Sequence, residues 1–172
     1  MVAGLRKTQP LNRALTINMN EYRVTKYNPD NRNELGHYLD LSEWTEFSDV
    51  GKSVTLDEYE VIESAYINSA LDLITNSKTV GLTIESLEDY QGSCEYKDEE
   101  LVPFSKLPGV VRSLLRGEYW CKLVAKEGFI HIGYDYYMYV GSSISDADTI
   151  SRVINRGLYV ENFISPYHPE DC

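Results

Sequence analysis

Cysteine is scarce in this chain of 172 residues, and its three copies, Cys94, Cys121 and Cys172, show no CxxC spacing. A disulfide framework and a cysteine-rich zinc site both need several cysteines at regular spacings, so the sequence predicts neither. The three histidines are also far apart, and no HxxxH or HExxH segment occurs. The pattern therefore indicates no metal site.

Phosphate-binding and nucleophile motifs are missing too: the chain has no GxxxxGK[ST], GxGxxG or GxSxG. A nucleotide cofactor is therefore not expected. No apolar run approaches the ~20 residues of a membrane span, and no signal-peptide pattern opens the chain. We expect no cofactor, no membrane association and a cytoplasmic protein with reduced thiols.

Basic residues are outnumbered, since 16 Lys and Arg stand against 27 Asp and Glu, a net charge of −11. Three of the bases lie in the first 20 positions, which hold no acid, so the other 152 residues carry a net charge of −14. Such a surface repels nucleic acid and attracts a basic protein. Direct nucleic-acid binding is not expected, although acidity also simply favours solubility.

Aromatic residues are unevenly distributed among types: 14 tyrosines accompany 4 phenylalanines and 2 tryptophans. Tyrosine combines an apolar ring with a polar tip, and it suits both half-buried strands and protein interfaces. Four tyrosines fall within "HIGYDYYMYV" (131–140), together with a histidine and an aspartate. This stretch is the first candidate for a functional surface.

Hydrophobic periodicity predicts one α+β domain over residues 21–172, preceded by a disordered basic leader at 1–20. The clearest element is a long helix at about 55–77, with Thr55 and Glu58 as a capping box and Glu63 as the one charge in its apolar stripe. We expect it to pack on one face of a mainly antiparallel sheet, with two shorter helices. The predicted shorter helices are 105–118 and 143–157, and the predicted strands are 21–27, 79–87, 119–126, 129–140 and 158–164.

A hairpin between the strands 119–126 and 129–140 divides their side chains into two faces. A two-residue turn at Glu127-Gly128 opposes Leu123 to Ile132. One face is then almost purely apolar and should be the core side; it contains Cys121, Leu123, Ala125, Ile130, Ile132, Tyr134, Tyr136, Met138 and Val140. The opposite, outer face carries His131, Asp135, Tyr137 and Tyr139.

This division separates the residues that could form a catalytic pair. Cys121 and His131 point to opposite faces, whereas a thiol–imidazole pair needs hydrogen-bond contact. His131 and Asp135 share a face but lie roughly 13 Å apart along an extended strand. No catalytic residue is therefore predicted.

A second candidate surface is the early loop "DLSEWTEFSD" (40–49), which combines acidic and aromatic residues. Its acids recur every three residues, around two aromatic rings, without the pattern of an EF-hand loop. The alternatives are an ordinary solvated loop and a contact patch for a protein partner. The residues concerned are Asp40, Glu43, Trp44, Glu46 and Asp49.

Three segments together resemble a family of small bacterial immunity proteins encoded beside polymorphic or contact-dependent growth-inhibition toxins. They are N-P-x-x-R-N-E (28–34), W-T-x-x-S-D-x-G-K (44–52) and "GYDYYMYVG" (133–141), and the resemblance extends over about residues 21–167. It implies an antitoxin that binds one cognate toxin domain in the producing cell. Many such toxins are nucleases, whose substrate clefts are basic.

We therefore predict a non-catalytic protein that neutralises a toxin domain, with the early-loop residues and the outer-face residues His131, Asp135, Tyr137 and Tyr139 as the contact surface. An acidic surface with outward tyrosines suits a basic cleft. The oligomeric state stays open. Two alternatives also remain: a small enzyme that uses His131 and Asp135, and a carbohydrate-binding module in which tyrosines stack on sugars.

Overall fold

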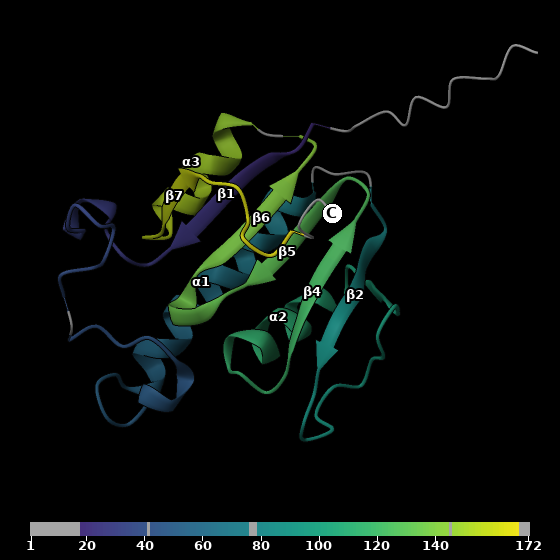
Figure 1. The fold of residues 1–172 in the computed structure, drawn as a ribbon, viewed down its shortest axis with the longest axis horizontal. Helices are drawn as coiled ribbons and strands as arrows, with labels where there is room; N and C mark the ends of the chain where they lie inside the picture. The colour runs from purple at the N-terminus through teal and green to yellow at the C-terminus, as the bar shows by residue number, and fades with distance from the viewer. Residues whose placement is uncertain (1–17, 41, 76–78, 145, 169–172) are drawn as a thin grey trace, which may run out of the picture.

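The structure, a computed structural model, describes residues 18–40, 42–75, 79–144 and 146–168. In this part of the chain seven strands form one antiparallel sheet in the order β3-β2-β4-β5-β6-β1-β7 (Figure 1). The strands are β1 (Asn20–Thr25), β2 (Gly81–Glu88), β3 (Leu101–Pro103), β4 (Trp120–Ala125), β5 (Gly128–Ile132), β6 (Met138–Ser142) and β7 (Tyr159–Asn162). Strand β3 is the one that the sequence pattern did not predict.

Three α-helices in the described ranges share a hydrophobic core on one face of this sheet: α1 (Leu56–Thr75), α2 (Leu107–Leu115) and α3 (Ala147–Asn155). Helix α1 contacts α2, α3, β5 and β6, and Figure 1 shows it crossing behind β5 and β6. The predicted α+β fold, with a long helix packed on an antiparallel sheet, is confirmed. No described helix is long and apolar enough to cross a membrane.

Helix α1 begins at the predicted capping box. The Thr55 backbone N–H donates to Glu58 Oε2 at 3.0 Å, and the Glu58 N–H donates to Thr55 Oγ1 at 3.3 Å. These bonds satisfy N–H groups that the first turn of a helix leaves without a partner. Residues 1–17 of the predicted leader lie outside the described residues.

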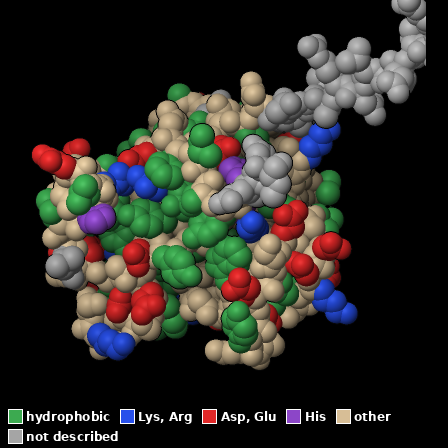
Figure 2. Space-filling view, in the orientation of Figure 1, with side chains coloured by type: hydrophobic (Ala, Val, Ile, Leu, Met, Phe, Trp, Pro, Cys, Tyr) green, Lys and Arg blue, Asp and Glu red, His purple; other side chains and the backbone are tan. Residues whose placement is uncertain are grey.

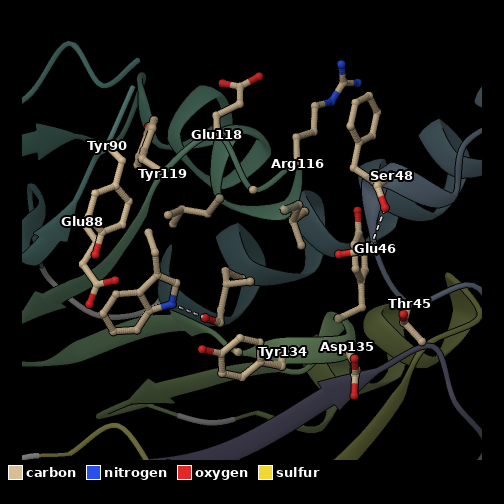
Figure 3. A pocket seen from close by; sticks show the side chains of 18 of the residues that line it. Thr45, Glu46, Ser48, Glu88, Tyr90, Arg116, Glu118, Tyr119, Tyr134 and Asp135 are labelled. Atoms are coloured by element: carbon tan, nitrogen blue, oxygen red, sulfur yellow. Dashed lines mark hydrogen bonds between the residues drawn. The ribbon is translucent and has the colours of Figure 1, made fainter. Parts of the chain in front are cut away.

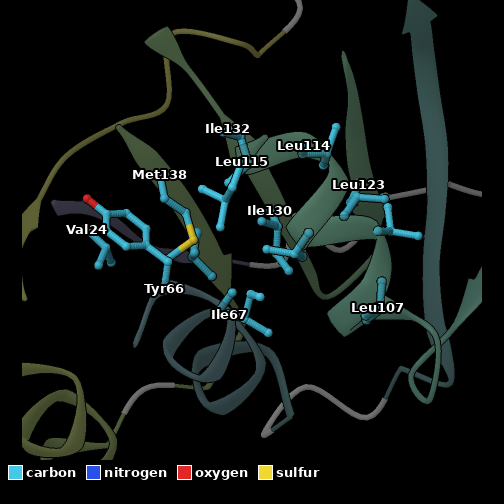
Figure 4. Close-up of a cluster of buried hydrophobic side chains, with 14 of the residues drawn as sticks. Val24, Tyr66, Ile67, Leu107, Leu114, Leu115, Leu123, Ile130, Ile132 and Met138 are labelled. Atoms are coloured by element: carbon cyan, nitrogen blue, oxygen red, sulfur yellow. The ribbon is translucent and has the colours of Figure 1, made fainter. Parts of the chain in front are cut away.

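The core lies between α1, α2 and the strands (Figure 4). Tyr66 and Ile67 of α1 are at most 4% exposed, and Ile130 and Met138 of the sheet are fully buried. Leu107 anchors α2 in the same cluster. Burying each aliphatic side chain of this size contributes about 1.5–3 kcal/mol, so this layer holds the helices on the sheet.

The single charge in the apolar stripe of α1 is neutralised by α2. Glu63 is 2% exposed and accepts from Arg116 Nε at 2.6 Å, from Arg116 Nη2 at 2.9 Å and from Arg112 Nε at 3.3 Å. A buried carboxylate is stable only when it is paired in this way. Glu63 therefore joins two helices.

The β4–β5 register differs from the predicted one by two positions. Leu123 is opposite Ile130 and Ala125 is opposite Gly128, so the loop is Lys126-Glu127. Gly128 pairs within the sheet, and a glycine is needed there because a Cβ would lie 2.8 Å from the Gly141 carbonyl oxygen. A shift of two keeps every side chain on its face, so the predicted separation of Cys121 from His131 stands.

The predicted strand 129–140 is wrong, because the chain folds back in its middle. Ile132 pairs with Met138, so β5 and β6 form an antiparallel hairpin whose turn contains the short 3-10 segment η3 (Tyr134–Tyr136). Tyr134, predicted for the core face, is 87% exposed, whereas Tyr136 is 3% exposed as predicted. The alternation of a strand no longer applies to residues in a turn.

Candidate functional site

A groove opens where the β5–β6 turn meets the end of α2, the early loop and the end of β2 (Figure 3). Its volume is about 680 Å³. Its polar, charged and aromatic lining residues come from five separate segments of the chain. The lining includes Thr45, Glu46, Phe47, Ser48, Glu88, Tyr90, Leu114, Leu115, Arg116, Glu118, Tyr119, Trp120, Ile132, Tyr134, Asp135, Tyr136 and Tyr167.

The β5–β6 turn sets the shape of one wall. The Tyr137 N–H donates to the Tyr134 carbonyl at 3.1 Å, and the Gly133 N–H donates to the Tyr137 carbonyl at 2.7 Å. Asp135 and Tyr136 have φ angles of 55° and 61°, the left-handed pair of a type I′ hairpin turn. Glycine usually occupies the second of these positions, so a tyrosine there is strained.

Contacts to the core hold Tyr136 in this conformation. Its hydroxyl donates to the Tyr59 hydroxyl, its ring lies 5.0 Å from that of Trp44, and its carbonyl accepts from the Tyr66 hydroxyl at 2.8 Å. Burial raises the pKa of Tyr59 to about 12, so this hydroxyl stays protonated and serves as a hydrogen-bonding group. The anchored Tyr136 leaves Tyr134 and Asp135 projecting at the tip of the turn.

The charge of the groove is predominantly negative. Glu46, Glu88, Glu118 and Asp135 line it, and none of them takes part in an ion pair among the described residues. Arg116, the one basic residue that lines it within the described ranges, is held by Glu63 and by Glu60. Glu46 accepts from the Ser48 hydroxyl, so the rim offers mainly the carboxylates of Glu88, Glu118 and Asp135 to an incoming group, whereas its guanidinium is already bound.

The floor of the groove is apolar. Leu114 and Leu115 of α2 are 5% exposed, and Ile132 is 4% exposed. Trp120 presents its ring while its indole N–H donates to the Ile132 carbonyl at 2.7 Å. With this N–H satisfied, the indole acts as an apolar surface.

The early loop contributes less to the groove than the sequence predicted. Of its five predicted contact residues only Glu46 lines the groove. Asp49 accepts from the Thr45 N–H at 2.8 Å and from the Glu46 N–H at 3.3 Å, so it organises the loop internally. Asp40 is exposed and accepts from the Ser42 N–H at 3.0 Å.

Trp44 and Glu43 belong to a lysine site beside the core. The Trp44 ring packs 5.2 Å from that of Tyr59, and Lys26 Nζ lies 4.1 Å from the Trp44 ring centre. The Lys26 ammonium donates to Glu43 Oε2 at 2.5 Å, while burial lowers the pKa of Lys26. Trp44 is half-buried and Glu43 is already paired, so neither is a free contact group.

The outer sheet face is partly covered, which corrects the predicted exposure of His131 and Tyr139. They are 2% and 7% exposed, because the C-terminal segment (163–168) crosses them. Figure 2 shows this face, with hydrophobic side chains over its centre and acidic side chains around it. The Tyr167 ring lies 5.8 Å from the Tyr139 ring and 6.0 Å from the His131 ring.

The remaining two outer-face candidates differ. Tyr137 is half-buried, with its ring 6.1 Å from that of Tyr38 and 5.4 Å from the Arg23 guanidinium. Asp135 is exposed at the tip of the turn. The structure therefore brings Asp135 and Glu46 together in the groove and leaves the other predicted contact residues outside it.

The groups proposed for catalysis are also separated. His131 lines a second cavity of about 110 Å³, whereas Asp135 lines the groove. Burial lowers the pKa of His131 to about 3 and raises the pKa of Cys121 to about 12, so the imidazole is neutral and the thiol protonated near pH 7. Within the described ranges, no group of three or more His, Cys, Asp or Glu is placed to hold a metal ion.

Four groove residues were missed in the sequence: Glu88, Tyr90, Glu118 and Tyr134. Tyr90 and Tyr134 are 91% and 87% exposed. A signal existed for Tyr134, since the aspartate that follows it is a residue type that tolerates a left-handed turn. The other three come from segments that only the fold brings together.

No protein-family model matches this chain. Likewise, no curated protein and no solved structure is significantly similar to it. Functional inference therefore depends on the groove and on the sequence motifs.

Proposed function

We propose that the protein is an immunity protein of a polymorphic or contact-dependent growth-inhibition system. In this role it binds a cognate toxin domain in the cytoplasm of the producing cell and covers the active site or the substrate surface of the toxin. The observation that carries the proposal is the groove, in which four carboxylates without ion-pair partners among the described residues surround an apolar floor beside two exposed tyrosines. The motif resemblance supplies the biological class.

The charge of the molecule supports a basic partner. The net charge of −11 speeds the approach of a positively charged domain, and the groove gives the attraction a local target. A nuclease domain fits this description because its substrate cleft must attract phosphate. A protein that fills such a cleft with carboxylates competes directly with the nucleic acid.

Tyrosine suits the same task. Tyr90 and Tyr134 are almost fully exposed, and large aromatic side chains are common among the residues that dominate binding energy in interfaces. A tyrosine ring has few rotatable bonds, so little side-chain entropy is lost when it is fixed. Exposed on a surface, such rings have no evident role in stabilising the fold.

The proposal is tested by co-expression in bacteria with the C-terminal domain of the secreted protein encoded immediately upstream. We expect the wild-type chain to restore growth and to co-purify with that domain. A triple variant, Glu88→Gln, Glu118→Gln and Asp135→Asn, should lose both effects, because it removes three negative charges at nearly constant shape.

Glu99→Gln is the matched control, since Glu99 is exposed, acidic and outside the groove lining. This variant should protect cells as well as the wild-type chain does. Failure of the wild-type chain to restore growth would reject the immunity role, and full protection by the triple variant would remove the groove from it.

A further inference from the structure

The groove combines two chemistries that one type of side chain satisfies together. Its floor is formed by apolar groups such as Leu114, Leu115 and Trp120, and its rim carries Glu88, Glu118 and Asp135. A compact anion is repelled by the rim, and a purely aliphatic side chain leaves the carboxylates without partners. A long side chain with an apolar stem and a cationic head matches both layers, because lysine and arginine bury the stem and keep the charge at the surface.

The tyrosines of the rim distinguish between the two cations. In Figure 3, Tyr90 lies near Glu88 at one margin of the groove, and Tyr134 lies near Asp135 at another margin. A guanidinium stacks on aromatic rings and donates two parallel hydrogen bonds to a carboxylate, whereas an ammonium is a compact and strongly hydrated charge. The groove therefore favours arginine.

The protein already shows this mode of binding within its own fold. Arg32 donates to both oxygens of Glu161, at 2.8 and 2.7 Å, with its guanidinium 4.8 Å from the ring of Tyr38. At the groove the corresponding carboxylates and tyrosines are present, but the only guanidinium that lines it in the described part of the chain, that of Arg116, is bound to Glu63 and Glu60. The position of the stacked arginine is left to a partner.

We infer that the groove binds an arginine side chain on a protruding segment of a partner protein, with its guanidinium at the acidic rim and its stem on the apolar floor. A volume of about 680 Å³ is enough for a segment of several residues, since sites for ligands of drug size measure ~300–1,000 Å³. This inference rests on the proposed function and names the chemistry by which the toxin is recognised. It also explains why a strained turn is kept there: the turn fixes Tyr134 and Asp135 at the rim.

The binding chemistry is tested without any toxin, by titrating the peptide Ac-Gly-Arg-Ala-Arg-Gly-amide into ¹⁵N-labelled full-length protein. We expect saturable shifts of the backbone amide signals of Gly117, Gly133 and Tyr134, which line or border the groove. The same peptide with citrulline, the uncharged isostere of arginine, should bind at least about tenfold more weakly, because a charge-assisted hydrogen bond contributes ~1.5–3 kcal/mol. The lysine peptide should bind several-fold more weakly than the arginine peptide.

Variants locate the site. Asp135→Asn, Glu118→Gln and Glu88→Gln should each weaken arginine-peptide binding, whereas Glu99→Gln should leave it unchanged. The inference is overturned if the shifts are absent, if the citrulline peptide binds equally well, or if the shifts spread over all acidic surfaces and survive in the three variants.

The two proposals fail in different ways. If growth is restored by co-expression but the arginine peptide does not bind, the immunity role stands and the arginine site is wrong. If the peptide binds at the groove but no protection is observed, the groove recognises arginine and the immunity role is rejected.

Discussion

His131 is a buried imidazole whose surroundings disfavour its protonated form. Its Nδ1 lies 2.8 Å from Ser165 Oγ, its Nε2 has no hydrogen-bond partner among the described residues, and its ring stacks 4.3 Å from that of Phe129. Burial, together with the charges of His168 and Lys122, lowers the pKa of the imidazole to about 3. The folded state therefore requires neutral histidine.

This requirement makes stability depend on pH in a definite direction. The unfolded chain binds a proton at His131 below its ordinary pKa of about 6.5, and the folded chain does so only below about 3. Unfolding therefore takes up a proton between these values, and stability falls as the pH is lowered through that window. Between pH 7 and pH 5 we expect a loss of about 2 kcal/mol in the free energy of unfolding, measured by urea denaturation.

His131→Gln should flatten this dependence above pH 5, whatever its effect on stability at pH 7. Equal slopes in the two proteins would show that His131 is not the titrating group. The carboxyl groups whose pKa is lowered, such as that of Glu161, lose their contribution at lower pH and do not obscure the comparison.

Tyr66 is a second residue whose polar atom matters more than its ring. Its hydroxyl accepts from the Lys26 N–H at 2.7 Å and donates to the Tyr136 carbonyl at 2.8 Å. Tyr66→Phe leaves both backbone groups without this partner, so we expect a loss of about 2–3 kcal/mol in the free energy of unfolding. Tyr90→Phe, at a site 91% exposed, is the control and should change that free energy by less than about 0.5 kcal/mol.

At the scale of elements, the backbone conformation of the β5–β6 turn places Tyr134 and Asp135 at the rim of the groove. Asp135 has φ 55°, a conformation that asparagine adopts readily and that a β-branched residue resists. A substitution of Asp135 can therefore remove its charge and keep the backbone conformation, or remove its charge and oppose that conformation. Two variants use this property.

Asp135→Asn should keep the melting temperature within about 2 °C of the wild type, while Asp135→Val should lower the free energy of unfolding by about 1–2 kcal/mol. Thermal melts followed by circular dichroism distinguish the two. Equal melting temperatures for both variants would mean that the left-handed turn is not maintained in solution.

The joint between α1 and α2 depends on Glu63, which binds Arg112 and Arg116. Glu63→Gln removes the negative charge and replaces one of the two acceptor oxygens that the guanidinium groups use by an NH2 donor. Because those side chains are 48% and 22% exposed, solvent screens part of the effect, and we expect a loss of about 1–3 kcal/mol. Urea denaturation of Glu63→Gln, Arg116→Gln and the double variant should show a smaller loss in the double variant than the two single losses predict; additive losses would mean that the pair is not coupled.

For the whole molecule, the net charge of −11 bears on the association with a basic toxin domain that we propose. We expect the association rate with the cognate toxin domain to fall at least about tenfold between 20 and 300 mM NaCl, while the dissociation rate changes little. Stopped-flow fluorescence measures both rates. An association rate independent of salt would exclude electrostatic capture.

Local patterns predicted most of the fold, because the long helix, the capping box and the alternating strands are set by neighbouring residues. The predicted strand 129–140 was wrong because the alternating pattern of the sequence continues through a turn. Tyr134-Asp135-Tyr136 fits the pattern of a strand, and only the core contacts of Tyr136 make the chain fold back. Gly128 was predicted to lie in the turn because glycine is a common turn residue, but it lies in β5, where close packing requires a glycine.

The candidate site was less predictable than the fold. Asp135 was predicted from the alternation of a strand and Glu46 from the spacing of acids in the early loop, whereas Glu88, Tyr90 and Glu118 enter the groove from segments distant in sequence. Burial of His131 and Tyr139 could not be read from their strand, since it depends on where the C-terminal segment crosses the sheet. Which face of a strand a side chain lies on depends on neighbouring residues, whereas its exposure depends on distant parts of the chain.

The position of β1 has a consequence for the timing of synthesis. It pairs with β6 on one side and β7 on the other, and its Arg23 binds Glu161, 138 positions further along the chain. At ~5–20 residues per second, the ribosome makes these partners on the order of ten seconds after β1 itself. The first strand must therefore wait for the last, and the complete sheet forms only in chains whose translation has reached β7.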